Sequence, residues 1–105
     1  MLIHSALFWL REDLSDGERS LFESELQRLA AIAYLERGYA GPAAATEQRA
    51  VTDNTFGYAT SLHFKSMADH AFYQTQCPDH ARFIAVCAPF WTRVVVHDIT
   101  PLPAG

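Results

Sequence analysis

Apolar and polar residues follow one order twice along this chain of 105 residues. Residues 2–10 and 58–65 both alternate in the way that strands do, and a serine (Ser15 or Ser66) follows each of them. After each serine, apolar residues recur at the spacing of one helical face, and a further strand candidate follows at 34–40 and at 91–99. This doubled β-α-β order predicts an α+β fold of the ferredoxin-like, split βαβ kind.

The repeat predicts a four-stranded antiparallel sheet with two main helices on one face, in one domain over residues 1–105. From the β-α-β order we also expect parallel central strands. Ser15 and Glu18 have the spacing of a capping box, and Pro78 suits the first turn of a short helix that Pro89 ends. Residues 42–57 lack periodicity and predict a long loop, which in a small domain is often functional or a lid over a cavity.

Both faces of the first strand are apolar, which affects the expected assembly. One face carries His4, Ala6 and Phe8, and the other carries Ile3, Leu7 and Trp9 among its apolar residues. Helices cover only one face, so the second needs another cover. A second copy of the same sheet is the usual one, and we therefore expect a homodimer.

Composition and charge exclude several classes of function. The net charge is −4, with 12 acidic and 8 basic residues, and no basic run indicates a nucleic-acid partner. No apolar run approaches the length of a membrane span, and the two cysteines, Cys77 and Cys87, are too few for a disulfide framework. We expect a cytoplasmic protein with reduced thiols. No phosphate-binding loop or metal-type spacing is present, so we expect no cofactor and no metal.

Several short segments, in their order and spacing, resemble the stress-responsive A/B barrel (Dabb) domain family of the dimeric α+β barrel superfamily. The resemblance covers nearly the whole chain. It implies a homodimer whose sheets pack face to face, with a cavity between each sheet and its own helices. The matching segments are 3–10, 14–18, 41–43, 49–53, 64–66, 73–75, 78–80 and 91–98.

The resemblance also implies candidate catalytic residues. Most members have no established activity, but a plant polyketide cyclase of the family closes a linear polyketide by aldol condensation. Its cavity holds a histidine of the first strand, a tyrosine of the second helix and the histidine of a Pro-x-His motif, which correspond here to His4, Tyr73 and His80. The present sequence departs from many members in having Cys77 before Pro78, where they have a histidine, and in one extra residue between Tyr73 and His80.

These three residues suit acid-base chemistry. A neutral histidine can take a proton from carbon next to a carbonyl, and a tyrosine hydroxyl can donate a hydrogen bond to the enolate that forms. The alternative is a core histidine at position 4 and a solvent-facing one at position 80. His70 shares a helix face with Tyr73, so it either lines the same cavity or lies half exposed. The inward positions expected to bind a ligand are Ala6, Phe8, Phe22, Leu26, Thr60, Leu62, Phe64, Met67, His70, Phe83 and Trp91.

The leading hypothesis is a protein that binds a small hydrophobic or aromatic molecule, with histidine-based, cyclase-like catalysis as its enzymatic form. A second hypothesis is a non-catalytic, stress-associated dimer. A third is a cofactor-independent monooxygenase, an activity found elsewhere in the superfamily. An open pocket that contains both His4 and His80 favours the first hypothesis, and a pocket filled by Phe22, Phe64 and Phe83 favours the second.

Overall fold

The alternating segments form one antiparallel sheet in the computed structural model, which describes residues 1–104. Its four strands lie in the order β2-β3-β1-β4, and every neighbouring pair is antiparallel. Our expectation of parallel central strands is wrong, because the central strands β1 and β3 are antiparallel. β1 and β2 do run in the same direction, but β3 lies between them and opposes both. The strands are β1 (Leu2–Leu10), β2 (Arg37–Pro42), β3 (Tyr58–Phe64) and β4 (Trp91–Ile99).

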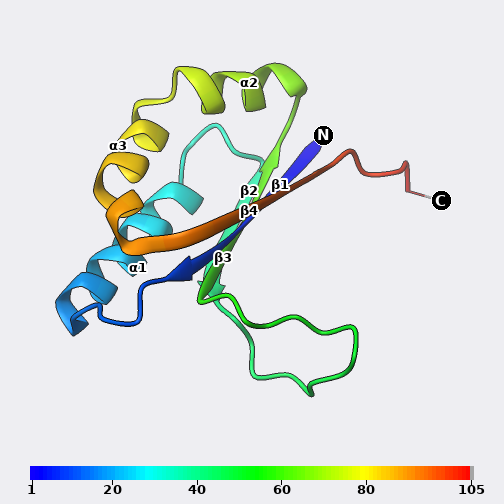
Figure 1. The fold of residues 1–105 in the computed structure, drawn as a ribbon. Helices are drawn as coiled ribbons and strands as arrows, with labels where there is room; N and C mark the ends of the chain where they lie inside the picture. Colours follow the sequence, from blue (N-terminus) through cyan, green and yellow to red (C-terminus); the bar gives the residue numbers. More distant parts are fainter. Residues whose placement is uncertain (105) are drawn as a thin grey trace.

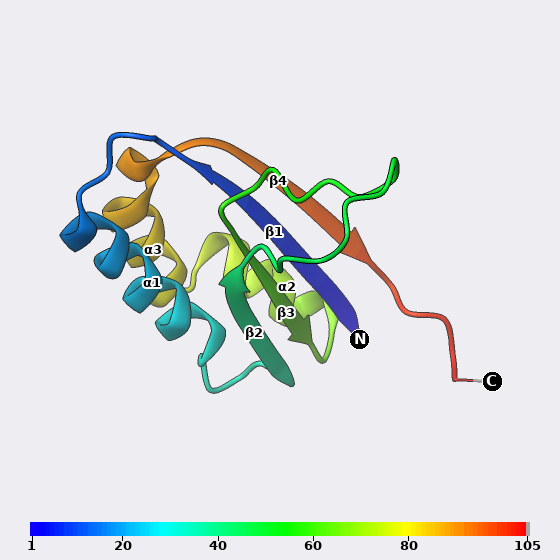
Figure 2. The ribbon, with the colours of Figure 1, turned by 90° about the horizontal axis from the view of Figure 1, so that it is seen from below.

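All three helices lie on one side of the sheet, where the sequence predicted the two main helices (Figures 1 and 2). They are α1 (Asp16–Ala30), α2 (Met67–Thr75) and α3 (Pro78–Cys87), and a 3-10 turn, η1 (Ala88–Phe90), leads into β4. The capping box of Ser15 and Glu18 is present, and the Ser66 hydroxyl accepts from the Asp69 amide. Pro78 opens α3, where its missing N–H costs nothing.

The second strand begins three residues later than the predicted strand at 34–40, and includes the Gly41-Pro42 pair that we expected to end it. Residues 31–36 instead form a turn, in which the Leu35 amide donates to the Ile32 carbonyl (3.1 Å). The apolar pair Tyr34 and Leu35, which suggested a strand, packs against the edge of the core. The third strand ends at Phe64, one residue before the predicted end.

The core lies between the inward face of β1 and β3 and the three helices. Phe22 of α1 and Phe64 of β3 are fully buried, and side chains of this size each contribute about 2–3 kcal/mol when removed from water. The opposite face of β1, with Ile3, Leu7 and Trp9, is only partly buried in a single chain.

The long loop between β2 and β3 extends away from the helices (Figure 1). It contacts the first strand at Trp9, whose indole N–H donates to the Thr55 hydroxyl (3.0 Å) and whose ring meets Phe56 edge-on. Trp9 belongs to the face opposite the helices. The loop is therefore not a lid over a cavity on the helix side.

Both cysteines are free and buried, and burial raises the pKa of the Cys87 thiol to about 11. A thiol with that pKa stays protonated near neutral pH and is a weak nucleophile. Within residues 1–104, no helix is both long enough and apolar enough to cross a membrane.

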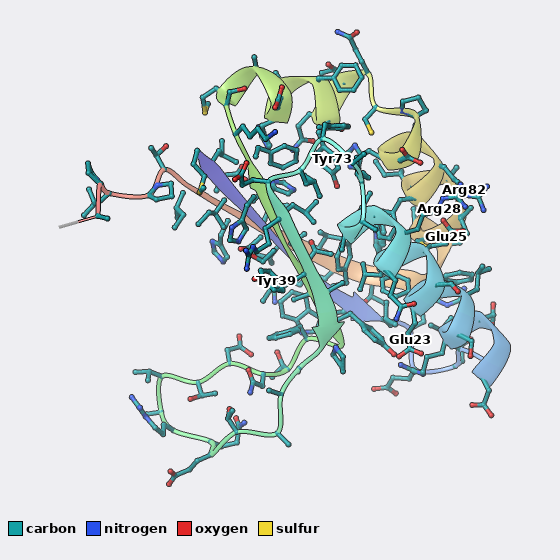
Figure 3. The ribbon with its side chains drawn as sticks, turned by 180° about the vertical axis from the view of Figure 1, so that it is seen from behind. Glu23, Glu25, Arg28, Tyr39, Tyr73 and Arg82 are labelled. Atoms are coloured by element: carbon teal, nitrogen blue, oxygen red, sulfur yellow. The ribbon has the colours of Figure 1, made fainter. Side chains whose placement is uncertain are left out.

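An ion pair between a buried carboxylate and a half-exposed arginine joins α1 to α3. Glu25 is only 5% exposed and accepts two hydrogen bonds from Arg82, at 2.9 and 3.2 Å (Figure 3). The guanidinium holds the pKa of the Glu25 carboxyl below its usual value of 4.5. This stabilisation is therefore present above pH 4.5 and is lost as the pH falls through the lower pKa of the folded state.

We expect Arg82→Met to lower Tm at pH 7 by several degrees, because it leaves a buried carboxylate without its partner. The control is Arg28→Met, since Arg28 and Asp79 are 4.0 Å apart and both well exposed. Thermal unfolding followed by circular dichroism at pH 7 and pH 3 measures both variants. The deficit of Arg82→Met should shrink at pH 3, and equal deficits for the two variants at pH 7 would contradict the role of this pair.

Candidate functional site

A cavity of about 320 Å³ lies between the sheet and helices α2 and α3. Strands β1, β3 and β4 form its floor, while α2, α3 and one residue of α1 form its walls. Most of its lining is aliphatic or aromatic, and five side chains bring polar groups to it: His4, Thr60, Tyr73, Gln74 and His80. Its lining residues are His4, Ala6, Phe8, Leu29, Thr60, Tyr73, Gln74, His80, Phe83, Ile84, Trp91, Val94 and Val96.

His4 is held in this cavity by a carboxylate from the neighbouring strand. In the antiparallel register of β1 and β4, His4 lies directly opposite Asp98, so both side chains are on the helix side. The Nδ1 atom of His4 lies 2.6 Å from Oδ1 of Asp98, and His4 is 4% exposed. An ionised carboxylate only accepts, so Nδ1 carries the proton. Nε2 then keeps its lone pair, and within residues 1–104 no side-chain hydrogen bond engages it.

His70 of α2 approaches the same pair from the helix side. Its Nε2 atom lies 3.3 Å from Nδ1 of His4 and 3.9 Å from Oδ1 of Asp98, and the Gln74 amide donates to it at 3.1 Å. Burial, and next the nearby His4, lower the pKa of His70, while Asp98 acts in the opposite direction. His70 is thus neutral near pH 7. The three donor atoms of His4, His70 and Asp98 all lie within 4.8 Å of one another, a cluster that the sequence did not suggest.

Tyr73 and His80 form the opposite wall. Figure 3 shows Tyr73 on the sheet side of α2, and its ring stacks on that of His80 with centroids 4.1 Å apart. The Tyr73 ring also lies 5.7 Å from the ring of His4. Burial lowers the pKa of His80 and raises the pKa of the Tyr73 phenol, so both side chains are neutral at pH 7. The cavity therefore presents neutral proton donors and acceptors in an apolar surrounding.

The structure brings the three predicted catalytic residues together, but it divides the predicted ligand-binding residues. Five of the latter line the cavity, and four others belong to the buried core and do not line it. The five are Ala6, Phe8, Thr60, Phe83 and Trp91, and the four are Phe22, Leu26, Leu62 and Phe64.

The remaining two predicted residues differ from each other. Met67 is 65% exposed in the first turn of α2, so its side chain lies toward solvent and does not line the cavity. His70 contacts His4 beside the cavity. Sequence reasoning missed the lining residues Leu29, Gln74, Ile84, Val94 and Val96, and it missed Asp98 as the partner of His4.

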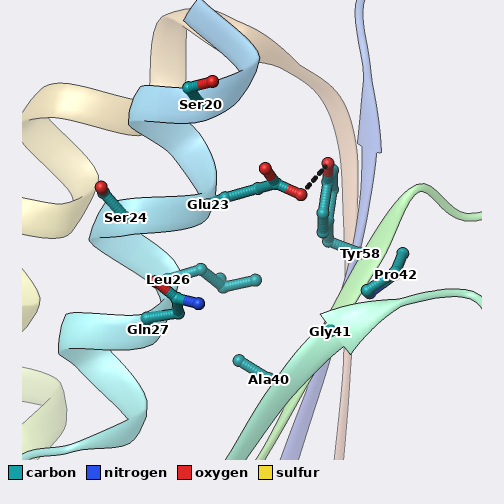
Figure 4. Close-up of a pocket in the computed structure, with 9 residues that line it drawn as sticks. All are labelled: Ser20, Glu23, Ser24, Leu26, Gln27, Ala40, Gly41, Pro42 and Tyr58. Atoms are coloured by element: carbon teal, nitrogen blue, oxygen red, sulfur yellow. Dashed lines mark hydrogen bonds between the residues drawn. The ribbon is translucent and has the colours of Figure 1, made fainter.

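A second cavity, of about 280 Å³, lies between α1 and the edge strand β2 (Figure 4). Its only carboxylate, that of Glu23, already accepts a hydrogen bond from the Tyr58 hydroxyl at 2.9 Å. It holds no histidine, so the cavity at His4 is the better candidate for acid-base chemistry.

Comparison with known proteins supports the fold described above. The family model of the stress responsive A/B barrel domain matches residues 2–101. A search of curated proteins finds no match.

Solved structures of the same fold include three informative neighbours. A dimeric ferredoxin-like protein of unknown function from Thermobifida fusca is 21% identical (TM-score 0.74; 95% of this chain, 90% of that one). A Dabb family protein from Mesorhizobium loti is 20% identical (TM-score 0.73; the match covers 96% of each chain). A hydroxynitrile lyase from Passiflora edulis is 20% identical (0.77; 99% and 95%). At such identities the likeness establishes the ferredoxin-like fold alone.

Proposed function

The chain belongs to the stress-responsive A/B barrel domain family, and from this premise we propose that it binds a small aromatic carbonyl compound and transfers a proton at it. The observation that carries the proposal is the 2.6 Å contact between His4 and Asp98 at the wall of an apolar cavity. Asp98 orients the imidazole and leaves Nε2 as the proton acceptor, as a carboxylate does in other carboxylate–histidine pairs.

The proposed step is removal of a proton from carbon next to a carbonyl. His4 accepts the proton at Nε2, and the electron pair of the C–H bond moves onto the carbonyl oxygen to give an enolate. The hydroxyl of Tyr73 or the ring N–H of His80 donates a hydrogen bond to that oxygen. The step needs no cofactor, because the proton returns to carbon, or the enolate attacks a second carbonyl as in an aldol cyclisation.

The lining favours an aromatic substrate. Phe8, Phe83 and Trp91 pack with ring centroids 5.4–5.8 Å apart at one end of the cavity, where a ligand ring can join them. Engineered cavities of about half this volume admit benzene, so a bicyclic compound is a suitable size. The hydroxynitrile lyase of Passiflora edulis, which shares the fold, gives independent support for lyase-type chemistry on this scaffold.

We also propose that the protein acts as a homodimer, joined by the sheet face of Ile3, Leu7 and Trp9. Three structural neighbours of unknown function are described as dimeric. The partly exposed apolar face needs a cover, and a stable dimer should bury at least about 1,200 Å². Light scattering at micromolar concentration should give twice the chain mass of 11.8 kDa. Leu7→Asp should give the single mass, and a monomeric parent protein would contradict the assembly.

The proposed binding site can be tested by nuclear magnetic resonance on protein labelled with ¹⁵N in its histidines, with 2-tetralone as the aromatic carbonyl probe. We expect the His4 spectrum to show a protonated Nδ1 and a bare Nε2, and addition of 2-tetralone to shift His4 and His80. His63 and His97 lie on the opposite sheet face and serve as internal controls. Unchanged signals, or equal shifts at all five histidines, would contradict the site and favour a non-catalytic, stress-associated dimer.

A further inference from the structure

Three donor atoms converge beside the cavity from three different elements: Nδ1 of His4 on β1, Nε2 of His70 on α2 and Oδ1 of Asp98 on β4. The pairing of His4 with Asp98 does not explain why His70 is there. Nδ1 of His4 has one proton or one lone pair, so it makes one strong hydrogen bond, and Asp98 already takes it at 2.6 Å. The Nε2 atom of His70, 3.3 Å away, is therefore a surplus acceptor facing an occupied donor.

The contact with Gln74 shows which ring nitrogen of His70 is unprotonated. A side-chain amide nitrogen can only donate, so its 3.1 Å contact identifies Nε2 of His70 as the nitrogen that carries a lone pair. That is the form of histidine that binds a metal ion. His70 and Gln74 are four residues apart on one face of α2, so both side chains reach the same point. A half-turn of the amide presents its oxygen to that point.

From this convergence we infer that His4, His70 and Asp98 form a binding site for a divalent transition-metal ion of the zinc class. Two imidazoles and one carboxylate suit Zn²⁺ and its neighbours, and exclude the hard ions Mg²⁺ and Ca²⁺, which prefer oxygen. The fourth coordination position is open to Gln74 or to a water from the cavity, as it is in catalytic zinc sites.

The observed spacing fits such an ion after one side-chain movement. With metal–ligand bonds of about 2.05 Å at tetrahedral angles, donor atoms lie about 3.3 Å apart. The observed separations are 2.6, 3.3 and 3.9 Å, and both departures involve Asp98, which is too close to His4 and too far from His70. A shift of the Asp98 oxygen by about 1.3 Å toward His70 corrects both separations. Its side chain is 40% exposed and belongs to an edge strand, so it is free to move.

The affinity should be moderate. Metal-binding histidines usually donate their second ring nitrogen to a carboxylate or carbonyl, and loss of such a partner costs about 10–100-fold in affinity. Within residues 1–104, no side-chain hydrogen bond engages the second nitrogen of either histidine. We therefore expect micromolar rather than nanomolar dissociation constants for Zn²⁺.

Metal binding would also change what His4 can do. When Nδ1 binds the ion, the proton of the neutral imidazole moves to Nε2, which then can no longer accept one. Occupancy of the site and proton removal by His4 are therefore mutually exclusive, so the ion would inhibit the proposed proton transfer. The inference stands without that function, since it rests on the three donor atoms alone.

The test is calorimetric titration of Zn²⁺ into protein that carries no polyhistidine tag and has been stripped with a chelator. We expect one ion per chain at micromolar affinity, and Co²⁺ should give the visible absorption of a low-coordinate site. His70→Gln should weaken binding by about 100-fold or more, because a direct ligand matters at least as much as an outer partner. His63→Gln, which removes a histidine bonded to Ser61 on the other face, should leave affinity unchanged.

Two results would overturn the site: no binding by the parent protein, or equal affinity in His70→Gln and the parent. The metal-free protein titrated with 2-tetralone tests the proposed function separately. The Zn²⁺ titration can therefore fail without contradicting the proposed function, and the 2-tetralone titration can fail without contradicting the metal site.

Discussion

Gly38→Ala is expected to destabilise the protein by about 3 kcal/mol or more, although the change adds only one methyl group. A Cβ atom built on Gly38 would lie 2.0 Å from the carbonyl oxygen and 2.8 Å from the carbonyl carbon of Ala30. These are backbone atoms at the end of α1, so no side chain can rotate away, and β2 must move from α1. The φ angle of Gly38 is not positive, so the cause is the close approach and not backbone conformation.

Gly41→Ala is the matched control, since it lies in the same strand and a Cβ there meets nothing within 4 Å. It should change stability by no more than about 0.5 kcal/mol. Urea unfolding followed by tryptophan fluorescence measures both variants. If the midpoint of Gly38→Ala matches that of Gly41→Ala, β2 and α1 are not packed as described.

Removal of the proposed base, His4, should have the largest effect on the rate of proton exchange. If His4 removes a proton next to a carbonyl, the protein accelerates exchange of the benzylic protons of 2-tetralone with deuterium from the solvent. A positioned base contributes about 10²–10⁴-fold, and His4→Gln should lose most of that factor. Proton magnetic resonance follows the exchange directly, and near-ultraviolet circular dichroism verifies that the variant is folded.

Asp98 acts through His4 and is a positioning residue. Asp98→Asn keeps the shape but can donate to Nδ1, which places the imidazole proton on Nε2, so exchange should fall by about 100-fold. Binding of 2-tetralone should change little, so the loss should lie in the maximal rate and not in the apparent affinity. Asp98→Glu should restore part of the rate, whereas a general structural role would not distinguish Glu from Asn. His97→Gln, on the opposite face of β4, is the control and should exchange at the parental rate.

Alternation along the chain predicted the sheet well where the strands are half buried. The last strand spans residues 91–99 as predicted, and Tyr58, Thr60, Leu62 and Phe64 face inward as predicted. The edge strand β2 carries little of this signal, because its sequence is Arg-Gly-Tyr-Ala-Gly-Pro. Tyr34 resembled a strand residue, yet its ring packs against Phe64 and Phe72 from a turn.

The site could be predicted only in part, for a physical reason. An inward pattern identifies the face that a residue occupies, but it does not show where packing along that face leaves space. Phe8 and Phe64 both face inward, and only Phe8 lines the cavity. His4, Tyr73 and His80 were identified because a resemblance named their positions.

Asp98 was missed because its role depends on strand register. The pattern of β4 assigns it to a face, but only the pairing of β1 with β4 places it opposite His4. The cluster with His70 depends in addition on where α2 crosses the sheet. Neither the register of β1 with β4 nor the position at which α2 crosses the sheet can be read from one sequence. A polar residue at the end of an apolar strand is the only local signal.

Proton removal by His4 is tested by the exchange rate of 2-tetralone at rising concentrations, measured with metal-free protein and with free imidazole at the same concentration as the protein. We expect a rate that saturates with 2-tetralone and exceeds the imidazole rate by at least about 100-fold, because the cavity holds the proton beside an oriented base. A rate that rises linearly and equals that of free imidazole would contradict proton removal by His4.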